Sequence, residues 1–578
     1  MRKSLICSLL LFSHFVFSKA PINDVEKYAT FCRVYGIVKY YSNDVSQGKI
    51  NWDVHTVDYI PKIELVKNSE DFNQLLRDYL SIIICKESDS PVLLDYDKIQ
   101  KKYKTGKLEK RISFDWIDDN SINVENQKKI KNIISSFKMK KNVAFELGEK
   151  KKTISHKELF KFDSLSLSSN HYFLGFLQCW NLIEYFYPYK NLMDNKWDDV
   201  LKKDIVSFTI IQNRGDYIKK MKQLSSYLDD SHVAVRDLTQ QGKNDKWHPL
   251  NFICVEDKVV LYNLLSDSLK NTPTIKRGDI LTHVQGIPID SLFKNYLKKT
   301  SNSNLKGAKY QFALSFHYPP KDMPDSLCFT LNDSLNVYSK KLTFDKMNRI
   351  TPYKEPANIK DLDTKVGYIN TTNIGFSQFG KAMRKFKNKE FIIFDCRGYA
   401  DLGVLRYGVL LGGKPKDVSK FDYPYYRLPG HFLPWKDNYF GSTVEMALKL
   451  IGVMPENAGN VIPSFKRPFK GKGIILMNER AISFGETNIM TLKTYCKDCV
   501  LIGSNTKGAN GNVAVSKLIG DIDIGYTGLD LRFADGTQVQ RVGIKPDIEV
   551  FHKISDLIKG EDTLLNYSLE YIKKQQNY

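Results

Sequence analysis

The chain has 578 residues, of which 42% are hydrophobic and 26% charged, a composition typical of soluble globular proteins and not of disordered chains. This length is enough for three or four domains, each with its own core. An excess of 86 Lys and Arg over 65 Asp and Glu gives a formal net charge of +21. Because the lysines are spread along the chain, with no Arg-rich block and no nucleic-acid motif, we expect a solvated basic surface and no nucleic-acid partner.

The N-terminus has the pattern of a secretory signal peptide. Arg2 and Lys3 precede an apolar run from Leu5 to Phe17, and small residues follow at Ser18 and Ala20. We therefore expect residues 1–18 to be a signal peptide and the mature protein to be exported, into a bacterial periplasm. No later stretch reaches 18 uncharged apolar residues, so no transmembrane helix is expected.

An internal repeat follows. Residues 31–72 align without gaps with residues 176–217, at an offset of 145, and the pair Trp52-Asp53 matches Trp197-Asp198. Each copy has apolar residues at helical spacing, a loop, a Trp-Asp helix start and a further amphipathic helix. We predict a duplicated helical unit, within an N-terminal helical domain (19–169) and a second copy (170–240). The alternative is chance similarity between amphipathic helices.

The second copy runs into a joint that the first copy lacks. A helix is expected to end near Leu228 and a strand to begin at Val233, which leaves Ser231 and His232 between them. At the corresponding place near Glu87 the first copy has no histidine. A histidine on such a joint could serve as a base, although a lone histidine in a turn is more often structural.

Short strands are expected over residues 245–345, including Leu250–Val255, Val259–Asn263 and Ile280–Val284. The segment Gly-Asp-Ile-Leu from 278 to 281, followed by Val-x-Gly-x-Pro from 284 to 288, resembles PDZ domains, which bind peptide C-termini at a sheet edge. The alternative is an unrelated small β domain.

Residues 360–575 alternate between strand and helix, as in an α/β layer. Strands are expected at Val366–Asn370, Phe391–Asp395, Ile474–Met477 and Val500–Gly503, with a helix over 376–386 and a closing helix over 555–578. The stretch 401–470, rich in Tyr, Pro and Gly, is expected to be an insertion that shapes a cleft.

One serine stands at a strand-to-helix corner in this region. A buried strand ending at Met477 leads through a polar corner into a helical pattern that opens around Ser483. Such a serine is held on a fixed element, and the free N–H groups of the helix start can stabilise an oxyanion. The alternative is that Ser483 is only a helix N-cap.

Several motifs occur in a fixed order: Asp-Ser-His, the PDZ-like segment, Asp-x-Arg-Gly, Ser-x-x-Glu, Gly-x-x-Thr-x-Gly and Gly-Ile-x-Pro-Asp-Ile. Over residues 170–575 this order resembles the serine peptidases of the C-terminal processing peptidase and tricorn-core type. The resemblance implies an α+β multidomain protein. Its parts would be a crotonase-like (ClpP/crotonase) α/β protease core, a PDZ-like β domain and a helical N-terminal region.

The resemblance also implies roles for particular residues. Ser483 would be the nucleophile, and the backbone N–H groups of Phe484 and Gly398 would form the oxyanion hole. The general base would be His232, preceded by Ser231 as in the tricorn branch.

Two positions depart from the family pattern. Ala509 stands where the processing-peptidase branch has its basic lysine, so a Ser-Lys pair is not expected. Gln540 stands where the tricorn branch has a glutamate, and it can hydrogen-bond but carries no charge. Glu486 is a candidate supporter of the site, or else a carboxylate on the helix surface, and we expect Asp395 to pin its own loop.

The eight cysteines beyond the signal peptide are scattered in apolar runs, which indicates buried thiols more than a disulfide framework. Cys496 and Cys499 have CxxC spacing, but no second ligand pair is nearby, so no metal or cofactor is expected.

The sequence therefore predicts an exported serine endopeptidase that cleaves peptides or unfolded protein segments. The alternative is a peptide-binding protein on the same fold with weak or no catalysis. The pattern leaves the oligomeric state open.

Overall fold

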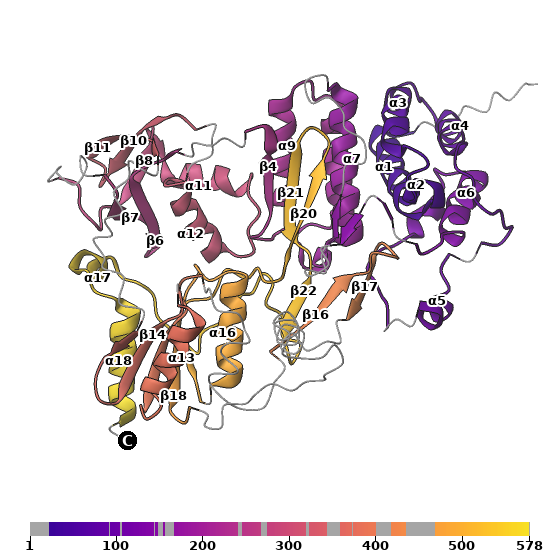
Figure 1. Cartoon of the computed structure of the whole chain (residues 1–578). Coiled ribbons are helices and arrows are strands. Elements are labelled where there is room, and N and C mark those ends of the chain that lie inside the picture. Colours follow the sequence, from indigo (N-terminus) through magenta and orange to yellow (C-terminus); the bar gives the residue numbers. More distant parts are fainter. Residues whose placement is uncertain are drawn as a thin grey trace, which may run out of the picture.

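The computed structural model describes residues 22–91, 93–103, 107–140, 142–143, 145–147, 154–156, 167–240, 246–266, 274–318, 323–343, 359–372, 374–399, 418–434, 469–496 and 498–576. The predicted signal peptide and most of the predicted insertion lie outside these residues. Figure 1 shows a helical N-terminal part on the right, a β-rich unit at the upper left and an α/β core below that unit.

Both copies of the predicted repeat fold into three helices. The first forms α1 (Asp24–Tyr41), α3 (Trp52–Glu64) and α4 (Ser69–Leu80), and the second forms α7 (Ser169–Phe186), α8 (Trp197–Thr209) and α9 (Arg214–Ser226). Each helix of the second copy begins 145 residues after its counterpart, the same offset at which the two copies align in the sequence.

The two copies pack against each other about a local pseudo-twofold axis. Gln178 binds Asp53 of the first copy, and Arg33, at the position equivalent to Gln178, binds Asp198, the equivalent of Asp53. The rings of the equivalent residues Tyr40 and Tyr185 lie 4.5 Å apart. Such reciprocal contacts are those of an isologous interface, here within one chain.

The remaining N-terminal elements are short. They are α2 (Asn43–Ser46), α5 (Tyr96–Tyr103), β1 (Glu109–Lys110), the 3₁₀ helix η1 (Asp115–Asp118), α6 (Val124–Ser135), β2 (Phe145–Leu147), β3 (Ile154–His156) and the 3₁₀ helix η2 (Lys190–Leu192). β2 pairs antiparallel with β3.

Two small sheets connect the repeat to the rest of the chain. In one, β4 (Ala234–Asp237) joins the hairpin of β20 (Val513–Leu518) and β21 (Ile522–Thr527), which lies beside α7 in Figure 1. In the other, the order is β1, β17 (His431–Pro434), β16 (Ser419–Pro424) and β22 (Asp530–Phe533). The described part of the insertion thus contributes two strands. The 3₁₀ helix η3 (Leu238–Gln240) follows β4.

A β-rich unit with its own core spans residues 246–343. Its elements are β5 (Lys246–Trp247), β6 (Leu250–Val255), β7 (Lys258–Leu264), β8 (Leu281–Val284), β9 (Ile287–Pro288), α11 (Ile289–Leu297), α12 (Leu305–Ser315), β10 (Ser326–Leu331), β11 (Leu335–Lys340) and β12 (Leu342–Thr343). The three predicted strands are present, and the hairpin β6–β7 packs with α12 around Phe252 and Phe329. That the unit is PDZ-like stays a prediction.

The α/β core is a six-stranded sheet. Its order is β13 (Ile359–Asp361), β14 (Val366–Asn370), β15 (Phe391–Asp395), β18 (Lys472–Met477), β19 (Val500–Gly503) and β23 (Ile548–Glu549). All neighbours from β14 to β23 are parallel, and β13 is antiparallel to β14. The carboxyl ends of β14, β15, β18 and β19 therefore meet at one edge, where open α/β sheets place their ligands.

Helices cover both faces of this sheet. α13 (Phe376–Lys385) and α16 (Phe484–Tyr495) pack on the face that carries Phe394 and Ile475, and α18 (Thr563–Gln576) packs on the face that carries Ile393 and Ile474. The single closing helix predicted from the sequence is wrong. It is split into α17 (Ile554–Lys559) and α18, because Gly560 takes a left-handed conformation with φ 74°.

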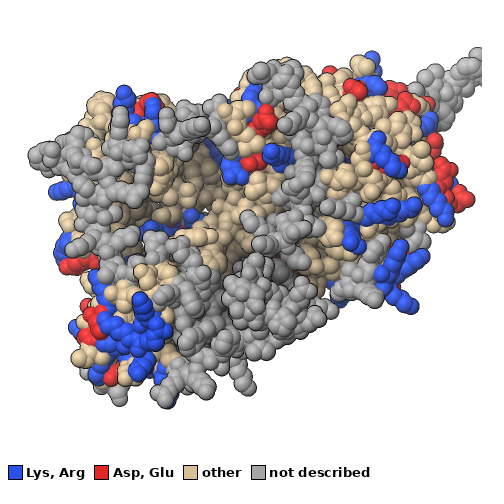
Figure 2. Space-filling model, in the orientation of Figure 1, with Lys and Arg blue, Asp and Glu red and all other residues tan. Residues whose placement is uncertain are grey.

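Lys and Arg form several separate groups on the face drawn in Figure 2, with Asp and Glu among them. In the described part of the chain, all eight cysteines are free thiols, and four of them are buried. Among the described helices, none combines the length and the apolar character needed to cross a bilayer.

Candidate active site

Ser483 lies between the carboxyl end of β18 and the first residue of α16. Its backbone conformation is one that residues other than glycine rarely adopt. Its φ is 55° and its ψ is −118°, and its side chain makes no capping hydrogen bond to α16. Ser483 therefore stands at the N-cap position of α16, but its side chain does not cap the helix. Its N–H donates to the carbonyl oxygen of Ala509 at 2.8 Å, so the loop after β19 holds this strained corner in place.

The Ser483 corner opens into a cavity of about 290 Å³. The lining mixes polar and apolar groups and comes from the loop after β15, from β16, from the start of α16 and from the 510–513 and 529–531 segments. The apolar side chains are Tyr399, Phe421, Phe484, Val513, Leu529 and Leu531. A cavity with these apolar side chains beside a strained serine is suited to hold a side chain of a bound substrate.

The loop after β15 is fixed by a buried ion-pair network. Arg397 binds Asp395 (Nη2 to Oδ2, 2.6 Å) and Asp562 of the C-terminal segment (Nη2 to Oδ2, 2.6 Å), and Asp395 also accepts the hydroxyl of Tyr368. Burial alone would raise the pKa of Asp395, but Arg397 outweighs it, so the pKa lies below its usual range. Asp395 thus pins its own loop, as predicted.

This loop brings Gly398 next to the start of α16. A Cβ atom on Gly398 would lie 2.0 Å from Oγ1 of Thr372, and one on Gly485 would lie 3.7 Å from the Gly398 carbonyl oxygen. Only glycine fits at position 398 without displacement of Thr372. Among the described residues, no protein acceptor takes the N–H of Gly398 or of Phe484, which leaves both groups available to an oxyanion.

His232 is held on its joint by backbone and side-chain bonds. Its N–H donates to Oδ1 of Asp230 at 3.0 Å, and its Nδ1 lies 2.8 Å from Oγ1 of Thr527, the last residue of β21. Burial lowers the pKa of the imidazole, Asp230 opposes this, and Lys507 adds to it. Thr527 pairs across the strands with Val513, which lines the Ser483 cavity. His232 and the Ser483 cavity are thus linked through neighbouring residues of the β20–β21 hairpin.

The other predicted site residues have different surroundings. Ser231 and Ser303 form a reciprocal pair, in which each N–H donates to the other hydroxyl at 2.9 Å. Gln540 is 1% exposed, and within the described ranges neither Oε1 nor Nε2 of its side chain has a hydrogen-bond partner. The Gln540 amide therefore makes no hydrogen bond to His232.

Glu486 is fully buried, so the alternative of a helix-surface carboxylate is wrong. Its carboxylate accepts the hydroxyl of Thr506 at 2.5 Å and the N–H groups of Gly508 at 2.8 Å and Ala509 at 3.2 Å. Burial raises the pKa of Glu486 to about 7, against the lowering effect of these bonds. Glu486 thus fixes the same loop that holds the backbone of Ser483.

The lysine of this loop points away from the serine. Nζ of Lys507 donates to Oε1 of Gln311 at 3.2 Å and lies over the ring of Tyr310, both on α12 of the β-rich unit. Burial lowers the pKa of Lys507 to about 8. Its contacts join the core to α12 and do not provide a base.

Two residues in this region were missed from the sequence. Asp230 belongs to the Asp-Ser-His motif but was given no role, and Thr527 lies in a strand that no motif marks. Only Thr527 had no signal in the sequence, because its role depends on a contact with His232, which lies 295 residues away in the chain.

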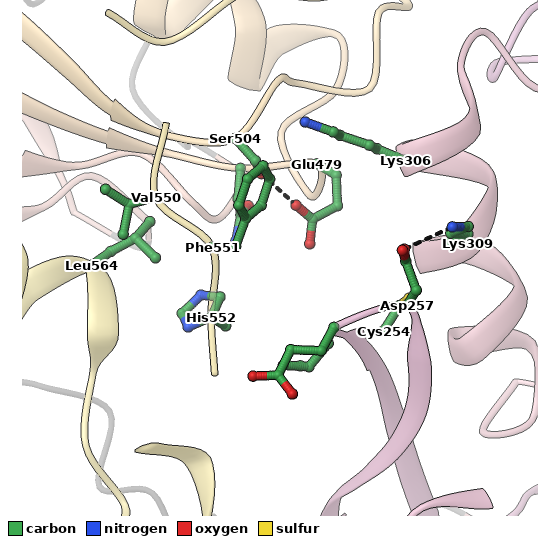
Figure 3. A pocket seen from close by; sticks show the side chains of 13 residues that line it. Cys254, Asp257, Lys306, Lys309, Glu479, Ser504, Val550, Phe551, His552 and Leu564 are labelled. Carbon is green, nitrogen blue, oxygen red and sulfur yellow. Dashed lines mark hydrogen bonds and ion pairs between the residues drawn. The ribbon is translucent and has the colours of Figure 1, made fainter. Parts of the chain in front are cut away.

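A second cavity, of about 110 Å³, lies between the β6–β7 turn, α12 and the core. Figure 3 shows Asp257 paired with Lys309 on one side and Ser504 donating to Glu479 on the other, with His552 between the two units. It shares no lining residue with the Ser483 cavity, so it is a separate feature of the boundary between the units.

The core resembles known peptidases. Residues 365–550, which hold strands β14 to β23 of the core sheet, Gly398 and Ser483, match the model of peptidase family S41. No curated protein sequence matches the chain. The structure of mature CPAF complexed with lactacystin is similar over 70% of this chain and 98% of that one, with a TM-score of 0.53 and 12% identity.

The crystal structure of mature CPAF is similar over 70% of this chain and 97% of that one, with a TM-score of 0.51 and 12% identity. At this identity the likeness shows a shared multidomain α/β fold. The family match covers residues 365–550, so this core is similar to that of the S41 peptidases.

Proposed function

We propose that the protein is an exported serine endopeptidase, with Ser483 as nucleophile and His232 as general base. The observation that carries the proposal is the strained backbone of Ser483, whose side chain makes no capping hydrogen bond and which lines a cavity of about 290 Å³. Strain of this kind persists only where the surrounding structure enforces it, and it exposes a nucleophile at a strand-to-helix turn.

The reaction proceeds through an acyl-enzyme. Oγ of Ser483 attacks the peptide carbonyl carbon while its proton passes to Nε2 of His232. The N–H groups of Phe484 and Gly398 stabilise the oxyanion, each by about 3 kcal/mol. The C–N bond then breaks as His232 returns the proton to the leaving amine. Water then attacks the acyl-enzyme ester by the same steps. Hydrolysis of the ester releases the acid product and restores Ser483.

The substrates are peptides or unfolded protein segments. The Tyr399, Phe421 and Leu531 side chains favour an apolar side chain next to the cleaved bond. The same proposal includes a PDZ-like domain over residues 245–345 and a crotonase-like core over residues 360–575. It also includes removal of residues 1–18 and a periplasmic location.

Replacement of the nucleophile tests the proposal. Ser483→Ala should abolish cleavage of a denatured protein substrate and labelling by a serine-reactive fluorophosphonate, with an unchanged circular dichroism spectrum. Ser334→Ala, at an exposed turn of the β-rich unit, is the matched control and should behave as wild type. Full cleavage by Ser483→Ala would refute the assignment.

A second candidate is a peptide-binding protein of weak or absent catalysis. The observation that favours it is Gln540, which carries no charge and contacts no described partner. The same incubation separates the two functions, because saturable binding of the denatured substrate without any cleavage or labelling would support the second candidate.

A further inference from the structure

A buried carboxylate, that of Asp230, lies beside His232. Asp230 and Thr527 are both 0% exposed. Oδ2 of Asp230 accepts the N–H of Thr527 at 2.7 Å, and Oδ1 accepts the Thr527 hydroxyl at 2.9 Å. The carboxylate also holds the backbone of His232 through Oδ1. One buried acid thus fixes both the residue that carries the imidazole and the residue that contacts it.

The hydrogen-bond inventory determines the tautomer of His232. A threonine hydroxyl has one proton, and an ionised carboxylate can only accept. Because the Thr527 proton goes to Asp230, Oγ1 of Thr527 can only accept from Nδ1 of His232, 2.8 Å away. Nδ1 therefore carries the ring proton. Nε2 keeps its lone pair, and within the described residues it makes no hydrogen bond.

We infer that Thr527 and Asp230 form a relay that positions His232 and sets it in the Nδ1–H tautomer required of a base acting through Nε2. This rests on the proposed function. The relay supplies a buried negative charge through one hydroxyl, which is the support that Gln540 lacks. When His232 takes up the Ser483 proton, the imidazolium donates through Nδ1 to Thr527, and the charge of Asp230 stabilises it.

The relay also joins segments that are far apart in the sequence. Thr527 ends β21, whereas Asp230 and His232 lie on the joint between α9 and β4. β4 pairs with β21 in the small sheet. This strand pairing therefore also brings His232 to Thr527. Both residues are therefore positioning residues.

The first experiment measures the tautomer directly and needs no activity. Protein with ¹⁵N-labelled histidine rings is studied by NMR, and the His232 signals are assigned by their loss in His232→Asn. The wild-type ring should show a protonated Nδ1 and an unprotonated Nε2. In Thr527→Val, which removes only the hydroxyl, this pattern should change to a mixture of tautomers. A wild-type Nε2–H tautomer, or an unchanged spectrum in Thr527→Val, would overturn the relay even in an active enzyme.

The second experiment measures cleavage as a function of pH. Thr527→Val should lower kcat about 100-fold with little change in KM, because a misoriented base forfeits much of its 10²–10⁴-fold contribution. Thr527→Ser should retain most of the rate. Asp230 and Lys507 are the charged groups that act on the imidazole, so Asp230→Asn should shift the acid limb of kcat/KM to lower pH.

A purely structural role would lower the rate without this shift, and that outcome would refute the relay. Thr330→Val, on β10 of the β-rich unit, is the matched control and should leave both the rate and the pH profile unchanged. If Ser483→Ala retained cleavage, the proposed peptidase site would fail while the NMR result still decided the relay.

Discussion

At the scale of single residues, Glu486 shows how a buried carboxylate can serve the site without taking part in chemistry. It lies one helical turn after Ser483 and accepts hydrogen bonds from Thr506, Gly508 and Ala509. The Ala509 carbonyl in turn accepts the N–H of Ser483. The carboxylate therefore sets the backbone of the nucleophile through one intervening residue.

Glu486 should make the stability of the folded protein depend on pH. Its pKa in the folded state, about 7, lies above the ordinary value of 4.5, so the folded state binds more protons between these values. The free energy of unfolding must then fall as pH rises from 4.5 to 7, by about 3 kcal/mol from this group. Glu486→Gln should flatten this dependence in urea unfolding measured from pH 4.5 to 8. An equally steep decline in both proteins would contradict the prediction.

At the scale of elements, the sequence predicts best where burial acts within a short segment. The buried parallel strands appear as continuous apolar runs, and Val366–Asn370, Phe391–Asp395 and Val500–Gly503 fold as predicted. The repeat was found for a similar reason, since Trp52 and Trp197 occupy the same structural place. Each indole Nε1 donates to a carbonyl of its preceding long helix, at Tyr35 and Trp180 respectively.

The sequence could not predict which distant segments pair as strands. β16 joins β22, and β4 joins β21, through partners more than 100 residues away, and no local pattern encodes such register. The same limit applies to the site. Ser483 and His232 carry motif signals, whereas the Thr527 support exists only once β4 and β21 are paired. The split of the closing helix depended on the backbone conformation of one glycine, Gly560.

The packing of α1 of the first repeat copy against α7 of the second provides a prediction at the scale of elements. A Cβ atom on Gly36 of α1 would lie 1.8 Å from Oδ1 of Asn181. Asn181 cannot yield easily, because its Nδ2 donates to the carbonyls of Cys32 and Leu177. Gly36→Ala should therefore destabilise the protein by about 1–3 kcal/mol through overpacking, despite the better helix propensity of alanine.

Gly215, in the first turn of α9, is the matched control. A Cβ there would meet nothing closer than 3.3 Å, so Gly215→Ala should be neutral or slightly stabilising. Urea unfolding of the two variants checks the difference, and equal midpoints would show that the α1–α7 crossing is not tightly packed.

At the scale of the whole molecule, the β-rich unit touches both halves of the site. Ser303 pairs with Ser231 on the histidine joint. Asn304, the N-cap of α12, donates from Nδ2 to the carbonyls of Thr506 at 3.0 Å and Lys507 at 2.8 Å. These contacts join residues 303–304 to the histidine joint and to the loop after β19, so the position of the unit bears on the alignment of base and nucleophile.

Asn304→Ala should therefore reduce cleavage more than its cost in stability explains. Loss of the cap costs about 1 kcal/mol, as it should for Asn213→Ala, which removes the N-cap of α9 and touches no residue of the site. Only Asn304→Ala also frees the 506–507 carbonyls, and through them the loop whose Ala509 holds Ser483. We expect similar unfolding midpoints for both variants but a kcat reduced about 10-fold in Asn304→Ala alone, measured with a denatured substrate. Equal kcat values would mean that the β-rich unit and the site are aligned by other contacts.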